Sequence, residues 1–144
     1  MSRASLSLVA ALGAALALNI APACAEVIKY KAELNGPSEV PPTTSKGVGT
    51  IEADLDTTAK TITWSGTYSG LTGPAVAAHF HGPAAAGKNA PPVVPVDAKA
   101  SPFKGSAALT DEIAKEFADG MIYFNIHTAE NKGGEIRGQL APAK

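Results

Sequence analysis

The chain has 144 residues, of which 45% are hydrophobic and 17% are charged. With 12 basic and 13 acidic side chains, its formal net charge is −1. A near-neutral chain without a cluster of Lys and Arg lacks the electrostatic footprint of a nucleic-acid-binding protein. The same observation excludes a basic helix that lies on a membrane surface, and the length fits one domain.

The first 25 residues have the features of a bacterial export signal. Arg3 gives a positively charged start, residues 6–21 are mostly Ala and Leu, and residues 23–25 form a small-residue cleavage site. The apolar stretch is shorter than the ~20 residues that a transmembrane helix needs. We therefore expect a signal peptide over 1–25, cleaved after Ala25, and a periplasmic or secreted protein.

Removal of this segment leaves one domain over 26–144, in which we expect no membrane span. It also removes Cys24, the only cysteine, so the mature domain has no disulfide and depends on a hydrophobic core for its stability. Lipid attachment at Cys24 is the alternative interpretation. That motif usually has Leu three residues before the cysteine, where this chain has Ala21.

Several short segments alternate apolar and polar residues, which is the period of a half-buried β-strand. In one of the clearest, Ile122, Phe124 and Ile126 share one face. The second and third segments are expected to form a hairpin, and so are the last two. The expected strands are 28–34, 51–55, 61–68, 76–81, 93–96, 103–109, 121–127 and 136–140.

One short helix is expected over 110–119. Thr110 is a favourable N-cap, Ile113 and Phe117 lie four residues apart on one face, and Gly120 follows the end. About seven or eight strands and one helix in a domain of this size predict an all-β fold, an antiparallel β-sandwich.

Two of the three histidines lie on one strand. Because side chains alternate along a strand, His79 and His81 share a face, and Phe80 points to the core with Val76 and Ala78. Their Cα atoms are about 6.6–6.8 Å apart, twice the strand rise, so both imidazoles can reach one metal ion. The alternative is a solvated pair on the surface.

The third histidine, His127, ends the strand whose core face holds Ile122, Phe124 and Ile126. It therefore lies on the opposite face with Tyr123 and Asn125, which we expect, like Arg137, to support the ligands or to steer an anion. If this strand neighbours that of His79 and His81, three neutral imidazoles meet. Three histidines without a thiolate suit Cu(II), Zn(II) or Ni(II), and the affinity order favours copper.

Arg137 is the only arginine of residues 26–144 and lies on the polar face of the last strand. We expect it to pair with Glu135 or another surface acid, or to guide an anion toward the histidines. Paired carboxylates, a nucleophilic serine and a phosphate-binding loop are all missing from the sequence, so no catalytic residues are assigned.

The chain resembles the CHRD (chordin) domain family over nearly all of residues 28–140. This resemblance implies an immunoglobulin-like β-sandwich, distantly similar to copper/zinc superoxide dismutase. Three motifs carry it: Glu-Val-Pro-Pro at 39–42, His-Phe-His-Gly at 79–82 and Gly-Glu-Ile-Arg-Gly-Gln at 134–139.

The dismutase similarity implies copper ligands at His79, His81 and His127, with Arg137 as an anion-steering residue. The chain departs from that pattern, since it has no fourth histidine and no histidine-rich loop after His81. A zinc site of the dismutase type is therefore excluded.

Three hypotheses follow. The leading one is a non-enzymatic exported domain that binds a copper-like metal through the three histidines, for sequestration or transfer. The second is an envelope-structural or interaction module that binds an envelope or extracellular protein without metal. The third is a weak copper-only superoxide dismutase.

Overall fold

The computed structural model describes residues 26–143, so the expected signal peptide and Cys24 lie outside the described residues. In this part of the chain, nine strands and one α-helix confirm the all-β class. Eight strands correspond to the expected ones, and the ninth has two residues, too few to show alternation. The elements are β1 (Val27–Asn35), a 3-10 turn η1 (Gly36–Ser38), β2 (Val48–Asp56), β3 (Thr61–Ser69), β4 (Ala75–His81), β5 (Pro92–Val96), β6 (Phe103–Ala108), α1 (Asp111–Ala118), β7 (Tyr123–Thr128), β8 (Ile136–Gln139) and β9 (Ala141–Pro142).

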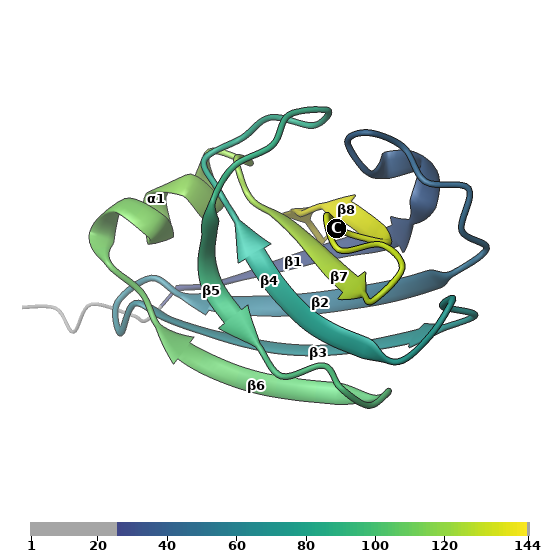
Figure 1. Cartoon of the computed structure of the whole chain (residues 1–144). Helices are drawn as coiled ribbons and strands as arrows, with labels where there is room; N and C mark the ends of the chain where they lie inside the picture. Colours follow the sequence, from purple (N-terminus) through teal and green to yellow (C-terminus); the bar gives the residue numbers. More distant parts are fainter. Residues whose placement is uncertain (1–25, 144) are drawn as a thin grey trace, which may run out of the picture.

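The strands form one continuous antiparallel sheet that folds over itself into two facing layers (Figure 1). Its order is β5-β4-β7-β8-β1-β2-β3-β6, with β9 beside β1. The sheet bends from one layer to the other between β8 and β1, which pair through Asn35 and Arg137. Strands β4, β5, β7 and β8 make one layer, and β1, β2, β3 and β6 make the other.

The two expected hairpins are present. β2 and β3 pair over nine residues each, and their turn is closed by Asp56, whose Oδ1 accepts from the backbone N–H groups of Thr58 and Ala59 at 2.9 and 2.7 Å. β7 and β8 pair from Tyr123–Gln139 to Ile126–Ile136. This second hairpin carries much of the candidate site.

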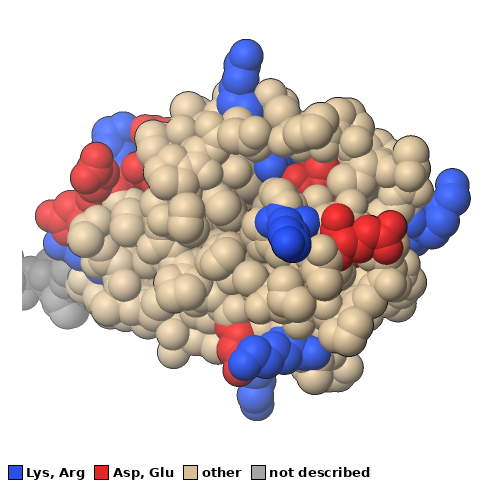
Figure 2. Space-filling view, viewed as in Figure 1, with Lys and Arg blue, Asp and Glu red and all other residues tan. Residues whose placement is uncertain are grey.

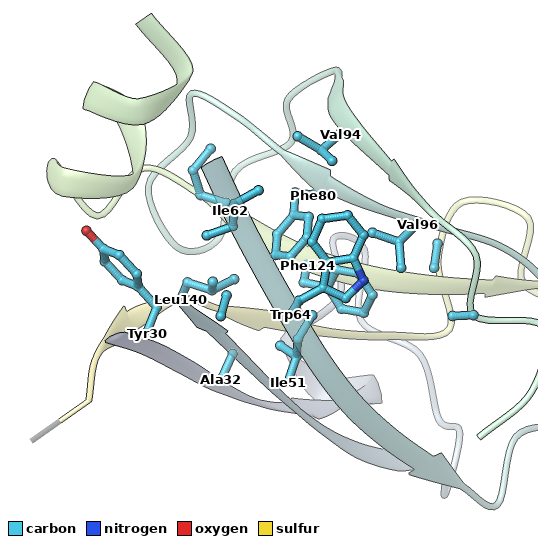
Figure 3. Packing of buried hydrophobic residues seen from close by; sticks show 14 of the residues in the cluster. Tyr30, Ala32, Ile51, Ile62, Trp64, Phe80, Val94, Val96, Phe124 and Leu140 are labelled. Carbon is cyan, nitrogen blue, oxygen red and sulfur yellow. The ribbon is translucent and has the colours of Figure 1, made fainter. Parts of the chain in front are cut away.

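The core lies between the two layers (Figure 3). Phe80 of β4 is fully buried and its ring centroid lies 5.5 Å from that of Trp64 on β3 and 5.1 Å from that of Phe124 on β7. These aromatic contacts join the facing layers and hold β4 and β7 side by side. This packing also fixes the positions of the side chains on the opposite face of β4 and β7, which include the three histidines.

The helix is confirmed close to its expected bounds. Thr110 Oγ1 accepts from the backbone N–H of Ile113 at 3.3 Å, and Gly120 with φ +70° follows the last turn. Phe117 is buried, with its ring centroid 5.7 Å from those of Tyr30 and Phe80. The helix therefore closes one end of the core.

The expectation that Val76 points to the core is wrong. Val76 is 54% exposed, whereas Ala75 and Ala78 are buried. The register between β4 and β7 shifts between Ala75 and Ala77, so the alternation of faces restarts after this irregularity. His79 and His81 lie beyond it, and their shared face is unaffected.

Basic and acidic side chains are interspersed on the face shown in Figure 2, in keeping with the near-neutral composition. Within residues 26–143, no helix is long and apolar enough to cross a membrane.

Candidate metal centre

The pairing of β4 with β7 brings the three histidines together. In this register His79 is opposite Asn125, His81 is opposite Tyr123, and His127 is opposite Ala77. One ligand nitrogen from each histidine lies within 4.8 Å of the other two. The sequence predicts that the three imidazoles meet if these two strands are neighbours, and they are.

Two backbone carbonyls fix the protonation of two of the rings. His81 Nδ1 lies 2.9 Å from the carbonyl oxygen of Ala90, and His127 Nδ1 lies 2.9 Å from that of Lys132. A carbonyl oxygen only accepts, so each neutral ring carries its proton on Nδ1 and presents a lone pair on Nε2. Hydrogen bonds of this kind orient histidines that ligate metals.

One of these two Nε2 lone pairs accepts a hydrogen bond from a neighbouring histidine, and the other has no partner in the described part of the chain. His127 Nε2 lies 3.2 Å from His79 Nδ1. His81 Nε2 is buried and has no hydrogen-bond partner among the described residues. Two nitrogens bound to one ion at ~2.0–2.1 Å are at most about 4.2 Å apart. A small movement of the side chains from the present separation, which is within 4.8 Å, would allow all three nitrogens to reach one ion.

The surroundings favour neutral imidazoles. Burial lowers the pKa of all three histidines below the usual value of 6.5. The neighbouring His127 lowers the pKa of His79 further, and the Arg137 charge lowers that of His127. A metal ion therefore meets little competition from protons at neutral pH.

Tyr123 links the histidines to Arg137. Its ring stacks on that of His81, with centroids 4.8 Å apart and an angle of 4°, and Arg137 Cζ lies 4.0 Å from the centre of the same ring. Because β4 and β8 flank β7 on opposite sides, His81 and Arg137 contact the Tyr123 ring from opposite sides. The Tyr123 hydroxyl contacts Ala90, whose carbonyl also holds His81.

The expected pairing of Arg137 with Glu135 or another surface acid is wrong. Arg137 Nε donates to Glu39 Oε2 at 2.9 Å, and both side chains are buried, at 5% and 2% exposure. Arg137 also donates to Asn89 Oδ1 at 2.8 Å and to the Lys88 carbonyl at 3.2 Å. Burial raises the pKa of Glu39, and the Arg137 charge opposes this rise.

Glu135 has other partners. Its carboxylate accepts from Ser45 Oγ at 2.6 Å, from the Thr72 backbone N–H and hydroxyl at 2.7 Å each, and from Thr128 Oγ1 at 2.5 Å. Burial alone would raise the pKa of Glu135, but these hydrogen bonds lower it to about 2. Glu135 thus ties the loop before β2 and the loop before β4 to the β7–β8 hairpin.

Sequence reasoning missed Glu39, Asn89 and the structural role of Glu135. Glu39 stands in the Glu-Val-Pro-Pro motif, but its partner Arg137 lies 98 residues away, so sequence spacing gives no sign of the pair.

The face of β7 opposite the core is not exposed to solvent. Tyr123 and Asn125 are 2% and 1% exposed there, because the segments 36–45 and 82–91 cover it.

Together these features define an all-β domain with a buried polar face and a three-histidine cluster at its edge. The CHRD domain family model matches residues 30–140. The chain therefore belongs to the CHRD domain family, as the sequence motifs predict. No curated protein and no solved structure matches the chain significantly, so the similarity to superoxide dismutase gains no support from these comparisons.

Proposed function

We propose that this CHRD domain binds a copper ion through His79, His81 and His127. The observation that carries the proposal is the convergence of three imidazole nitrogens, two of which have their lone pairs aimed by backbone carbonyls. His81 Nε2 is buried without a hydrogen-bond partner in the described part of the chain, which destabilises the folded protein unless a ligand binds to this nitrogen.

The ligand set selects the class of metal. Among the described residues the cluster contains imidazoles alone, without a carboxylate or a thiolate. Neutral nitrogen ligands suit copper, nickel and zinc rather than calcium or magnesium, which prefer oxygen. Copper has the highest affinity for such sites among the divalent first-row metals.

The role we propose is sequestration or transfer of copper outside the cytoplasm. It combines the three-histidine cluster with the export signal expected over residues 1–25. The geometry favours binding over dismutase turnover, because an anion-steering cation must be accessible to solvent. The Arg137 side chain is 5% exposed and is paired with Glu39.

Calorimetric titration of metal-free protein with Cu(II) and Zn(II) tests the proposal. One-to-one Cu(II) binding is expected, with a loss of at least tenfold in affinity on His81→Ala. Thr67→Ala, on the exposed side of β3, is the control and should bind as the wild type does. Weak binding of several copper ions, or equal affinity in the His81→Ala variant, would overturn the proposal.

A further inference from the structure

Asn125 lies at the centre of the buried polar face, between the histidines and the Glu39–Arg137 pair. It is opposite His79 on β4 and opposite Arg137 on β8. Its side chain is buried, and neither Oδ1 nor Nδ2 has a hydrogen-bond partner among the described residues. A buried amide without hydrogen bonds is destabilising, which points to a partner that is not a protein atom.

The position of Glu39 determines which end of the Asn125 side-chain amide is the nitrogen and which is the oxygen. Glu39 Oε1, which also lacks a partner within the described residues, and Asn125 Nδ2 both lie within 3.0 Å of the point where a Cβ on Gly134 would stand. A carboxylate only accepts, so the amide nitrogen belongs on this side. Oδ1 is then an acceptor at the other end of the amide, away from Glu39.

On the neighbouring strand β4, His79 lies directly opposite Asn125, and His81 follows two residues later on the same face. Asn125 therefore lies beside the histidines on one side and beside Arg137, the partner of Glu39, on the other. Yet neither His81 Nε2 nor Asn125 Oδ1 has a hydrogen-bond partner in residues 26–143, so the two do not bond directly.

We propose that Asn125 positions a water molecule as the fourth, non-protein ligand of the metal ion, accepting a hydrogen bond from that water through Oδ1. This inference rests on the proposed function. Three protein nitrogens leave one coordination position open, as in metal sites that keep a bound water. The nearby Glu39 carboxylate favours the orientation in which the amide nitrogen faces it, so both residues are positioning residues.

The test is electron–nuclear double resonance of the Cu(II)-loaded protein in H₂O and in D₂O, which separates the strongly coupled protons of a bound water from the more distant N–H protons of the imidazole rings. The wild type should show a coordinated water. Asn125→Leu should retain one copper ion per chain but shift or lose the water proton coupling. Gln139→Leu is the matched control, because Gln139 carries a carboxamide on the same sheet face but donates to the Ala84 and Gly120 carbonyls.

An Asn125→Leu spectrum identical to that of the wild type would overturn the inference and leave the three-histidine site standing. A wild-type spectrum without the strongly coupled exchangeable protons of a bound water would do the same. Failure of the wild type to bind copper would overturn both proposals. If Asn125→Leu does not fold, Asn125→Ser gives the same test, because its shorter side chain does not reach the water.

Discussion

His79 Nδ1 on β4 stands 3.2 Å from His127 Nε2 on β7, although the two residues are 48 positions apart in the chain. The Lys132 carbonyl fixes the ring of His127 with its proton on Nδ1. The hydrogen bond between the two histidines is therefore donated by His79 Nδ1 to His127 Nε2. His79 Nδ1 would have to give up this proton to act as a ligand, so metal binding through that nitrogen would replace the hydrogen bond between the two rings.

Copper should stabilise the wild type against heat and should not stabilise His127→Ala. A ligand that binds only the folded state at 100 times its Kd adds ~2.7 kcal/mol to the free energy of unfolding. Differential scanning calorimetry with and without Cu(II) measures this as a rise of several degrees in Tm. An equal rise in the variant would place copper elsewhere on the chain.

Removal of one partner of the buried ion pair should be costly. Arg137→Met leaves the Glu39 carboxylate buried without its main counter-charge. We expect a loss of ~3–5 kcal/mol in the free energy of unfolding, the range seen when one member of a buried pair is removed.

The double variant Glu39→Leu with Arg137→Met removes both charges and should recover part of that loss. Denaturant unfolding of the wild type, the single variant and the double variant measures the three free energies. A single variant as stable as the wild type would show that the pair contributes nothing to the fold.

Two adjacent glycines offer a matched comparison. Gly134 has φ +130°, and a Cβ there would lie within 3.0 Å of Glu39 Oε1 and Asn125 Nδ2. A Cβ on Gly133 would meet nothing within 4 Å. Gly134→Ala should therefore lose ~2 kcal/mol or more of stability, from backbone strain and the clash, while Gly133→Ala should stay close to the wild type. Similar unfolding curves for the two variants would contradict the placement of Gly134 against this pair.

Stability should fall in acid because of Glu135. Its pKa is about 2 in the folded protein, whereas an unfolded Glu titrates near ~4.3. Between these values the unfolded chain binds more protons, so the contribution of Glu135 is complete above about pH 5 and is lost as the pH falls toward 2.

The Glu135→Gln variant should be less stable at pH 7, by ~2 kcal/mol, because the amide nitrogen cannot accept the hydrogen bonds of Ser45 and Thr72. Its stability should also vary less with pH between 5 and 2. Urea unfolding at several pH values measures both effects. A parallel decline in the wild type and the variant would assign the acid sensitivity to other groups.

The sequence predicts the strands, the helix and the shared face of His79 and His81, because these features depend on local periodicity. It also predicts the face of His127. It does not predict the distance between β4 and β7, which depends on the order of strands in the sheet. Val76 shows the limit of periodicity, since one irregularity in the register reverses the face that alternation assigns.

The buried polar face was beyond sequence reasoning for a different reason. Polar residues opposite an apolar face usually meet solvent, and alternation does not reveal that the segments 36–45 and 82–91 cover this one. Glu39 reaches Arg137 only because the segment after β1 crosses the end of β8. The partners of Arg137 and Glu135 are therefore properties of the tertiary fold.

X-ray absorption at the copper edge, on protein loaded with one equivalent of copper, tests the central claim most directly. The three-histidine site predicts nitrogen neighbours at ~2.0–2.1 Å, with outer-shell scattering from three imidazole rings. In His81→Ala the scattering from one ring should disappear. A wild-type spectrum with one imidazole or none would contradict the assignment of His79, His81 and His127 as the metal ligands.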